Sequence, residues 1–65
     1  MGNLWEIAQS PDGTLDILRD GIVLHKGIPD KWLLDQLVHY GLTGPEYRTL
    51  REQLNASGFA ALDYR

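Results

Sequence analysis

Two turn signals divide the first half of the chain into three short segments in which apolar and polar residues alternate. Residues 10–13 read Ser-Pro-Asp-Gly. There, proline presets φ, aspartate bonds the local backbone and glycine takes a positive φ. Residues 20–21 are Asp-Gly between two apolar segments, a pair typical of a two-residue β-hairpin. Because alternation with a period of two is typical of strands, we predict an antiparallel meander over residues 4–9, 14–19 and 22–26.

A first helix is predicted after this meander. Pro29 and Asp30 suit the first turn, where a missing N–H costs nothing and a carboxylate meets the positive end of the helix. Gly41 is a typical residue at which a helix ends. A helical projection places four apolar residues on one face: Leu33, Leu34, Leu37 and Val38.

Signals at both ends predict a second helix over residues 44–57. Thr43 and Glu46 have the spacing of a capping box, in which each side chain bonds the backbone of the other residue. Gly58 can adopt the left-handed conformation that ends a helix. Tyr47, Leu50 and Leu54 form its narrow apolar stripe.

The tail after the second helix, residues 59–65, also alternates and favours a fourth strand, with a short helical turn or a packed coil as the alternatives. The fold class expected is therefore α+β. A three-stranded antiparallel β-meander, joined by this C-terminal strand, packs against two α-helices. The residues expected to form most of the core are Trp5, Ile7, Leu15, Ile17, Ile22, Leu24, Leu34, Leu37, Leu50 and Leu54.

Size and charge limit the functions to consider. Sixty-five residues predict a single domain over residues 1–65. The chain has no cysteine to supply a disulfide or a thiolate metal site. Pairing with itself or with another protein is a common source of stability for such small domains. The net charge of −3 opposes phosphate binding, so nucleic acid is not an expected partner. With neither a bilayer-spanning apolar segment nor a secretory signal, the expected location is cytoplasmic, away from membranes.

No group of residues predicts an active site, a cofactor site or a metal site. Ser10 lies in a turn and Ser57 at a helix end, where serine commonly bonds the local backbone. Asp35 and His39 lie four residues apart on one helix, but a zinc site needs three or four ligands and His25 would have to complete it from the sheet. We therefore expect a protein that is not an enzyme.

The helix pair at residues 30–57 also allows an alternative function, a nucleic-acid-associated regulator of the helix-turn-helix kind. Leu37 and Gln36 depart from that motif's pattern of a small and an apolar residue before the turn glycine. Arg48 and Arg51 could face phosphates, although the same helix also carries Glu46 and Glu52.

Trp32 is the most informative candidate site residue. The helical projection places it nearly opposite the apolar face, beside Asp35, Gln36 and His39. Tryptophan is enriched at protein interfaces, so these four residues are the predicted partner-binding site. The alternative is that Trp32, in the first turn, packs under the sheet or against the tail.

The order of strand, hairpin and helix resembles that of many small bacterial and phage domains, a likeness of topology that implies no function. The sequence thus predicts a protein-interaction module, such as an accessory subunit, adaptor or inhibitor. Its partner would be another protein or a second copy of the chain.

Overall fold

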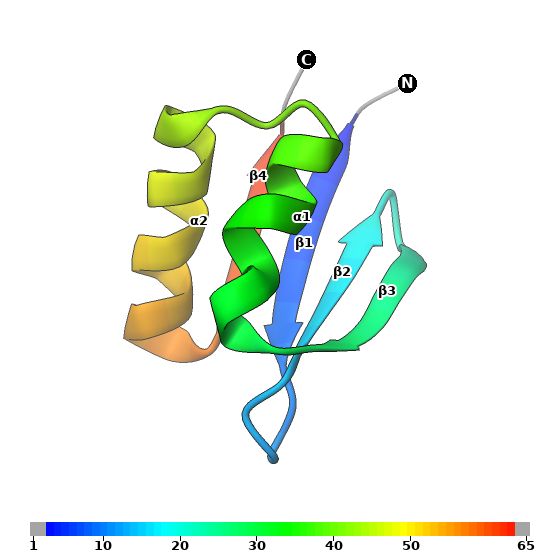
Figure 1. Ribbon diagram of the computed structural model, residues 1–65, viewed down its shortest axis with the longest axis vertical. Coiled ribbons are helices and arrows are strands. Elements are labelled where there is room, and N and C mark those ends of the chain that lie inside the picture. Colours follow the sequence, from blue (N-terminus) through cyan, green and yellow to red (C-terminus); the bar gives the residue numbers. More distant parts are fainter. Residues whose placement is uncertain (1–2, 64–65) are drawn as a thin grey trace.

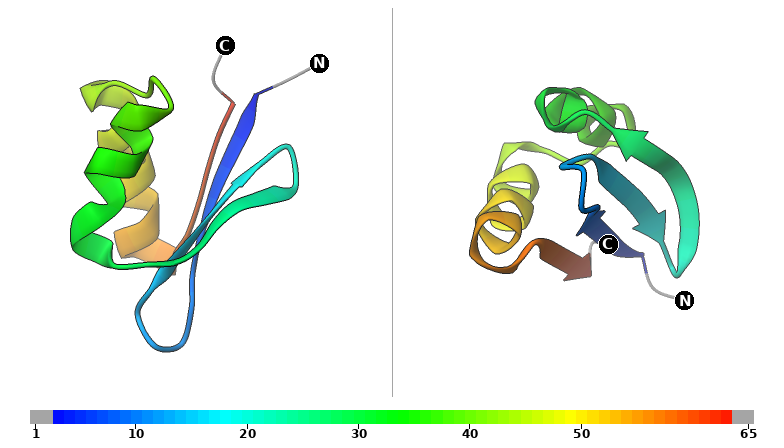
Figure 2. Two further views of the ribbon diagram at one scale, coloured as in Figure 1. Left: turned by 45° about the vertical axis from the view of Figure 1, so that its right-hand side comes forward. Right: turned by 90° about the horizontal axis from the view of Figure 1, so that it is seen from below.

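The computed structural model describes residues 3–63 and has the expected α+β architecture (Figure 1). Its four strands form one antiparallel sheet in the order β3-β2-β1-β4. The elements are β1 (Leu4–Gln9), β2 (Leu15–Arg19), β3 (Ile22–Ile28), a 3₁₀ turn (Asp30–Trp32), α1 (Leu33–His39), α2 (Gly44–Ser57) and β4 (Phe59–Asp63). Figure 2 shows that both helices cover the same face of the sheet and leave its other face open.

The two predicted turns are present. The Ser10 N–H donates to the Thr14 carbonyl at 2.8 Å, and the Asp12 carboxylate accepts the Thr14 N–H at 3.0 Å. At the hairpin between β2 and β3, both Asp20 and Gly21 have positive φ, 52° and 83°. This is the backbone of a type I′ turn, whose twist matches that of the strands it joins.

Strand β3 departs from regular alternation. Leu18 lies opposite Val23, but Ile17 lies opposite His25, so Leu24 is an extra residue in β3 and forms a β-bulge. The prediction that Ile22 and Leu24 belong to the core was wrong, and both are exposed. The bulge breaks the alternation at Leu24, while Ile22 directly follows the turn at the tip of the β2–β3 hairpin. Figure 2 shows that this tip points away from the helices.

The fourth strand is confirmed over residues 59–63 and pairs with β1, with Leu4 opposite Asp63 and Ala8 opposite Phe59. Residues 64–65 of the predicted strand lie outside the described residues. The strand nearest the C-terminus therefore lies beside the first strand, and β1 is central in the sheet. Side chains of α2 contact the outer edge of β4, where Gln53 Oε1 accepts the Ala61 N–H at 2.9 Å.

Helix α1 is short and follows the 3₁₀ turn without a break. It buries Leu33 and Leu37 but leaves Leu34 exposed, so the prediction of Leu34 as a core residue was wrong. The helix ends in a Schellman motif: the Gly41 N–H donates to the Val38 carbonyl at 2.9 Å, and the Leu42 N–H to the Leu37 carbonyl at 3.0 Å. This motif places the residue after the glycine against the last turn. Since Leu42 is fully buried with Leu37, the helix turns its Leu33–Leu37 side to the sheet.

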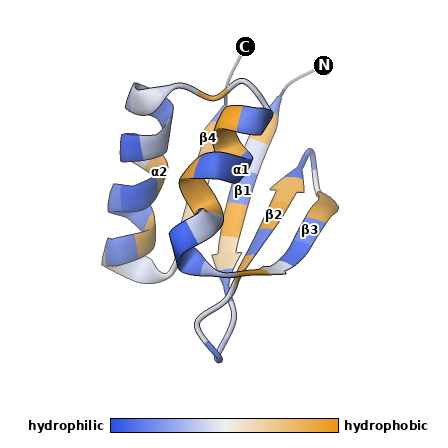
Figure 3. Ribbon diagram, viewed as in Figure 1, coloured by the Kyte–Doolittle hydropathy of each residue, from blue (hydrophilic) through white to orange (hydrophobic). Residues whose placement is uncertain are grey.

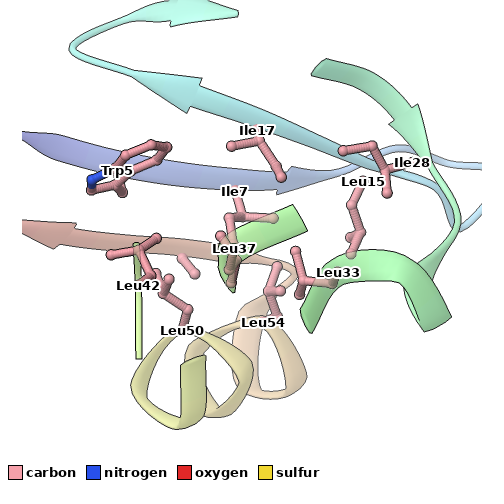
Figure 4. Packing of buried hydrophobic residues seen from close by; sticks show 11 residues of the cluster. Trp5, Ile7, Leu15, Ile17, Ile28, Leu33, Leu37, Leu42, Leu50 and Leu54 are labelled. Carbon is pink, nitrogen blue, oxygen red and sulfur yellow. The ribbon is translucent and has the colours of Figure 1, made fainter. Parts of the chain in front are cut away.

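Helix α2 has the predicted ends. The Thr43 N–H donates to Glu46 Oε1 at 3.0 Å in the capping box, and Gly58 ends the helix at a φ of 78°. Leu50 and Leu54 face the sheet. Figure 4 shows them among the buried residues that fill the space between helices and sheet. These residues are Trp5, Ile7, Leu15, Ile17, Ile28, Leu33, Leu37, Leu42, Leu50, Leu54 and Ala60.

Candidate functional site

Trp32 is exposed, and its ring is not part of the hydrophobic core. It is the last residue of the 3₁₀ turn, and 53% of its surface is accessible. Trp5, by contrast, is 3% exposed and contacts both the Tyr40 ring, whose centroid lies 5.1 Å away, and the Arg19 guanidinium at 5.5 Å. The two tryptophans thus have different roles: Trp5 stabilises the core, and Trp32 lies at the surface.

The other three predicted site residues lie on the helix that follows Trp32. Asp35 and His39 are exposed and Gln36 is half-buried. Residues three and four apart lie on the same side of a helix, so Trp32, Asp35, Gln36 and His39 share one side of this segment. We refer to these four residues as the Trp32 surface. A large aromatic ring beside hydrogen-bonding groups is a composition typical of protein interfaces.

His39 reaches the edge of an aromatic group centred on Tyr40. Its ring meets the Tyr40 ring edge-on at 5.4 Å, and His25 of β3 contacts the same tyrosine at 5.7 Å. Both histidines therefore contact Tyr40. The metal site considered from the sequence needs a third ligand, and none among the described residues joins them. Among residues 3–63 no group of three or more His, Asp or Glu side chains is placed to hold a metal ion.

A second side of α1 also carries exposed apolar residues. Leu34 and Val38 are 44% and 58% exposed and lie one helical turn apart. The hydropathy colouring of Figure 3 marks apolar positions on α1 as well as along the strands. The helical projection places both on the same face as Leu33 and Leu37, which are buried. The sequence of Gly41 followed by Leu42 was the signal that could have separated them from Leu33 and Leu37.

The open face of the sheet is a surface that the sequence analysis did not identify. Strand pairing places Leu18 between Glu6 and Val23, and Ala8 between Asp16 and Phe59, on the side away from the helices. The sequence signal for this surface was that the same strands carry apolar residues on both of their faces. We call this surface the open sheet face; it comprises Leu4, Glu6, Ala8, Asp16, Leu18, Val23, Phe59, Ala61 and Asp63.

The arginines considered for nucleic-acid binding differ in their surroundings. Arg51 Nη1 lies 2.8 Å from Asp30 Oδ2, and its Nε donates to the Tyr47 hydroxyl at 3.2 Å. The hydrogen bond with Asp30 is the main cause of a raised pKa of Arg51, which its partial burial opposes. Arg51 is therefore already engaged within the fold, whereas Arg48 is exposed.

Comparisons of the chain with protein-family models, with curated proteins and with solved structures found no match. Within residues 3–63, neither helix combines the length and apolar character needed to cross a bilayer.

Proposed function

We propose that this chain is a protein-interaction module that binds its partner through the Trp32 surface. The observation that carries the proposal is the 53% exposure of Trp32 beside a core that is complete without it. Leaving a large aromatic side chain in water forgoes the free energy that its burial would release, about 25 cal/mol for each Å². A partner that covers the ring releases that free energy on binding.

The polar neighbours of Trp32 favour a specific interface over non-specific hydrophobic association. Asp35 and His39 present charged or hydrogen-bonding groups, and Gln36 adds an amide at the margin of the helix. Binding hot spots are typically aromatic anchors surrounded by groups that exclude water. The Trp32 surface has such an anchor with polar residues on one side of it.

The test compares two truncations of exposed aromatic rings. Trp32→Ala removes the proposed anchor, and Phe59→Ala removes a ring of similar exposure on the opposite side of the molecule. Proteins that bind the wild-type chain are identified, and their affinities for the wild type and for the two variants are measured. We expect Trp32→Ala to weaken the complex by about 2 kcal/mol or more and Phe59→Ala to leave that complex intact.

The same comparison tests whether the partner is a second copy of the chain. Light scattering across a dilution series gives the oligomeric state of wild type and of both variants. A dimer lost with Trp32→Ala and kept with Phe59→Ala would identify self-association through the Trp32 surface. If every complex survives Trp32→Ala unchanged, the proposal is wrong.

A further inference from the structure

The open sheet face combines exposed apolar side chains with an excess of negative charge. Val23 and Phe59 are 52% and 46% exposed, Leu4 is also exposed, and Leu18 is half-buried. The carboxylates of Glu6, Asp16 and Asp63 lie among them. An apolar surface with a rim of polar groups is typical of a protein-binding site.

Cations are almost absent from this side of the protein. The four strands contain one arginine and one lysine, Arg19 and Lys26. The Arg19 guanidinium lies over the ring of Trp5, on the side of the helices. Lys26 and Gly27 lie on the edge strand β3 opposite Asp16, whose Oδ1 accepts the Gly27 N–H at 3.0 Å. The middle of the open sheet face, around Glu6, therefore has no lysine or arginine from the described strands.

Glu6 occupies the centre of this face. It lies between Leu18 of β2 and Ala61 of β4, on β1, one of the two interior strands. The one ion pair among residues 3–63 joins Arg51 and Asp30, so no cation of the described chain neutralises Glu6. A wholly apolar partner would bury this carboxylate without a counter-charge, which is costly. A partner with a Lys or Arg placed at Glu6 would avoid this cost.

Both edges of the sheet have features that prevent the addition of a strand, so a partner is expected on the face. At the β4 edge, Gln53 occupies the Ala61 N–H, and Ser57 Oγ lies 3.1 Å from the Phe59 carbonyl oxygen. At the β3 edge, the bulge at Leu24 and the charge of Lys26 interrupt a regular ladder. Occupied groups, bulges and lysines are features that prevent strand addition. The backbone hydrogen bonds of a helix lie within the helix. A helix can therefore pack on a sheet through side chains alone, as α1 and α2 pack on the opposite face.

We infer that the open sheet face binds a cationic amphipathic helix of another protein, with a Lys or Arg paired to Glu6 and apolar residues on Leu18, Val23 and Phe59. Four strands about 4.8 Å apart give a face about 14 Å wide, and a helix with its side chains is about 10 Å across, so one helix fits. A second copy of the same face is not the occupant, because Glu6, Asp16 and Asp63 would meet the same carboxylates. This surface lies opposite the Trp32 surface and does not depend on it.

The experiment uses a synthetic peptide as the probe. The peptide has about 18 residues, Leu at helical spacing and Lys elsewhere, and its matched control has Glu in place of every Lys. Binding to the full chain is followed by methyl-group NMR in about 0.15 M salt, where the Debye length of about 8 Å limits long-range attraction. We expect the Lys peptide to shift the methyl signals of Leu4, Leu18 and Val23 and to leave those of Leu34 and Val38 unchanged. The Glu peptide should shift neither group.

Matched charge changes then test the role of Glu6. Glu6→Lys and Glu52→Lys alter the net charge equally, but Glu52 lies on α2 and outside the open sheet face. We expect Glu6→Lys to weaken binding of the Lys peptide about tenfold or more, and Glu52→Lys to change it less than about threefold. Glu6→Gln, which preserves the shape of the side chain, should weaken binding in the same direction and guards against misfolding of the lysine variant.

Two outcomes would overturn the inference. Equal losses for Glu6→Lys and Glu52→Lys would show attraction to the net charge alone. Shifts confined to Leu34 and Val38 would place the peptide on α1. Phe59→Ala and Trp32→Ala separate this inference from the proposed function, because peptide binding should fall with Phe59→Ala and persist with Trp32→Ala.

Discussion

Asp30, in the 3₁₀ turn before α1, and Arg51, in the middle of α2, form an ion pair with Oδ2 and Nη1 2.8 Å apart. It is a side-chain link between the two helical segments. The Arg51 guanidinium also lies 5.5 Å from the centre of the Tyr47 ring, on its own helix. Arg51 therefore combines a charge contact with an aromatic one.

We predict a modest coupling between these two residues. The Asp30 side chain is 55% exposed, so water screens the pair. A double-mutant cycle with Asp30→Ala, Arg51→Ala and both changes together should give about 0.2–1 kcal/mol in urea unfolding. High salt should reduce this value. A coupling above about 2 kcal/mol would show that the pair is more shielded from water than the structure indicates.

The two tryptophans should respond differently to truncation. Trp5→Ala removes a buried ring and is expected to destabilise the fold by about 3–5 kcal/mol. Trp32→Ala removes a ring that is mostly in water and should change the free energy of unfolding by within about 0.5 kcal/mol. Urea titrations of both variants, monitored by far-UV circular dichroism, make the comparison. A severe loss with Trp32→Ala would mean that Trp32 packs as a core residue.

Glycine substitutions should separate strained from unstrained positions. Gly41 and Gly58 have φ values of 87° and 78°, where an added Cβ is strained, although space is available at both. Each change to alanine should cost about 1–2 kcal/mol. Gly44, in the first turn of α2, has no positive φ and no atom within 4 Å of an added Cβ. Gly44→Ala is therefore the control, and it should stabilise the protein by about 0.4–1 kcal/mol.

The capping box should make stability depend on acid. The Thr43 hydroxyl is the main cause of a lowered pKa of Glu46, and the Thr43 backbone N–H adds to it. A lowered pKa in the folded state means that Glu46 contributes stability above the ordinary glutamate pKa of about 4.3 and loses it as pH falls through the lowered value. The urea midpoints of wild type and Glu46→Gln should thus differ at neutral pH and converge in acid.

Thr43→Ala supplies the control for this pH effect. On that background the hydroxyl is absent, so Glu46→Gln should produce a smaller pH-dependent difference. An undiminished difference would assign the effect to a group other than Thr43.

The parts of the fold that sequence predicts well are those fixed by local chemistry. The Asp20–Gly21 turn and the Thr43–Glu46 capping box need only neighbouring residues, and both are present. The bulge at Leu24 depends on how β3 pairs with β2, which is a tertiary property. A strand that alternates in sequence can therefore lose its alternation in space.

The surface residues likewise divide into those that local geometry predicts and those that depend on tertiary structure. Helical geometry alone placed Trp32 beside Asp35 and His39, because these residues belong to one short segment. It could not choose between Leu33–Leu37 and Leu34–Val38, two pairs with identical spacing. The burial of Leu42 in the Schellman motif made that choice. The open sheet face could not be recognised until it was known that both helices lie on one side.

The pairing of Leu4 with Asp63 places the two ends of the described chain on adjacent strands, at one end of the sheet. Neighbouring strands are only about 4.8 Å apart, so a host protein could carry this domain as an insertion within a single surface loop, with both junctions side by side. The same closeness permits circular permutation: a short linker could join these ends, and new ends could be opened at the tip between β1 and β2. The order of elements along the chain could then change while the sheet order stays the same.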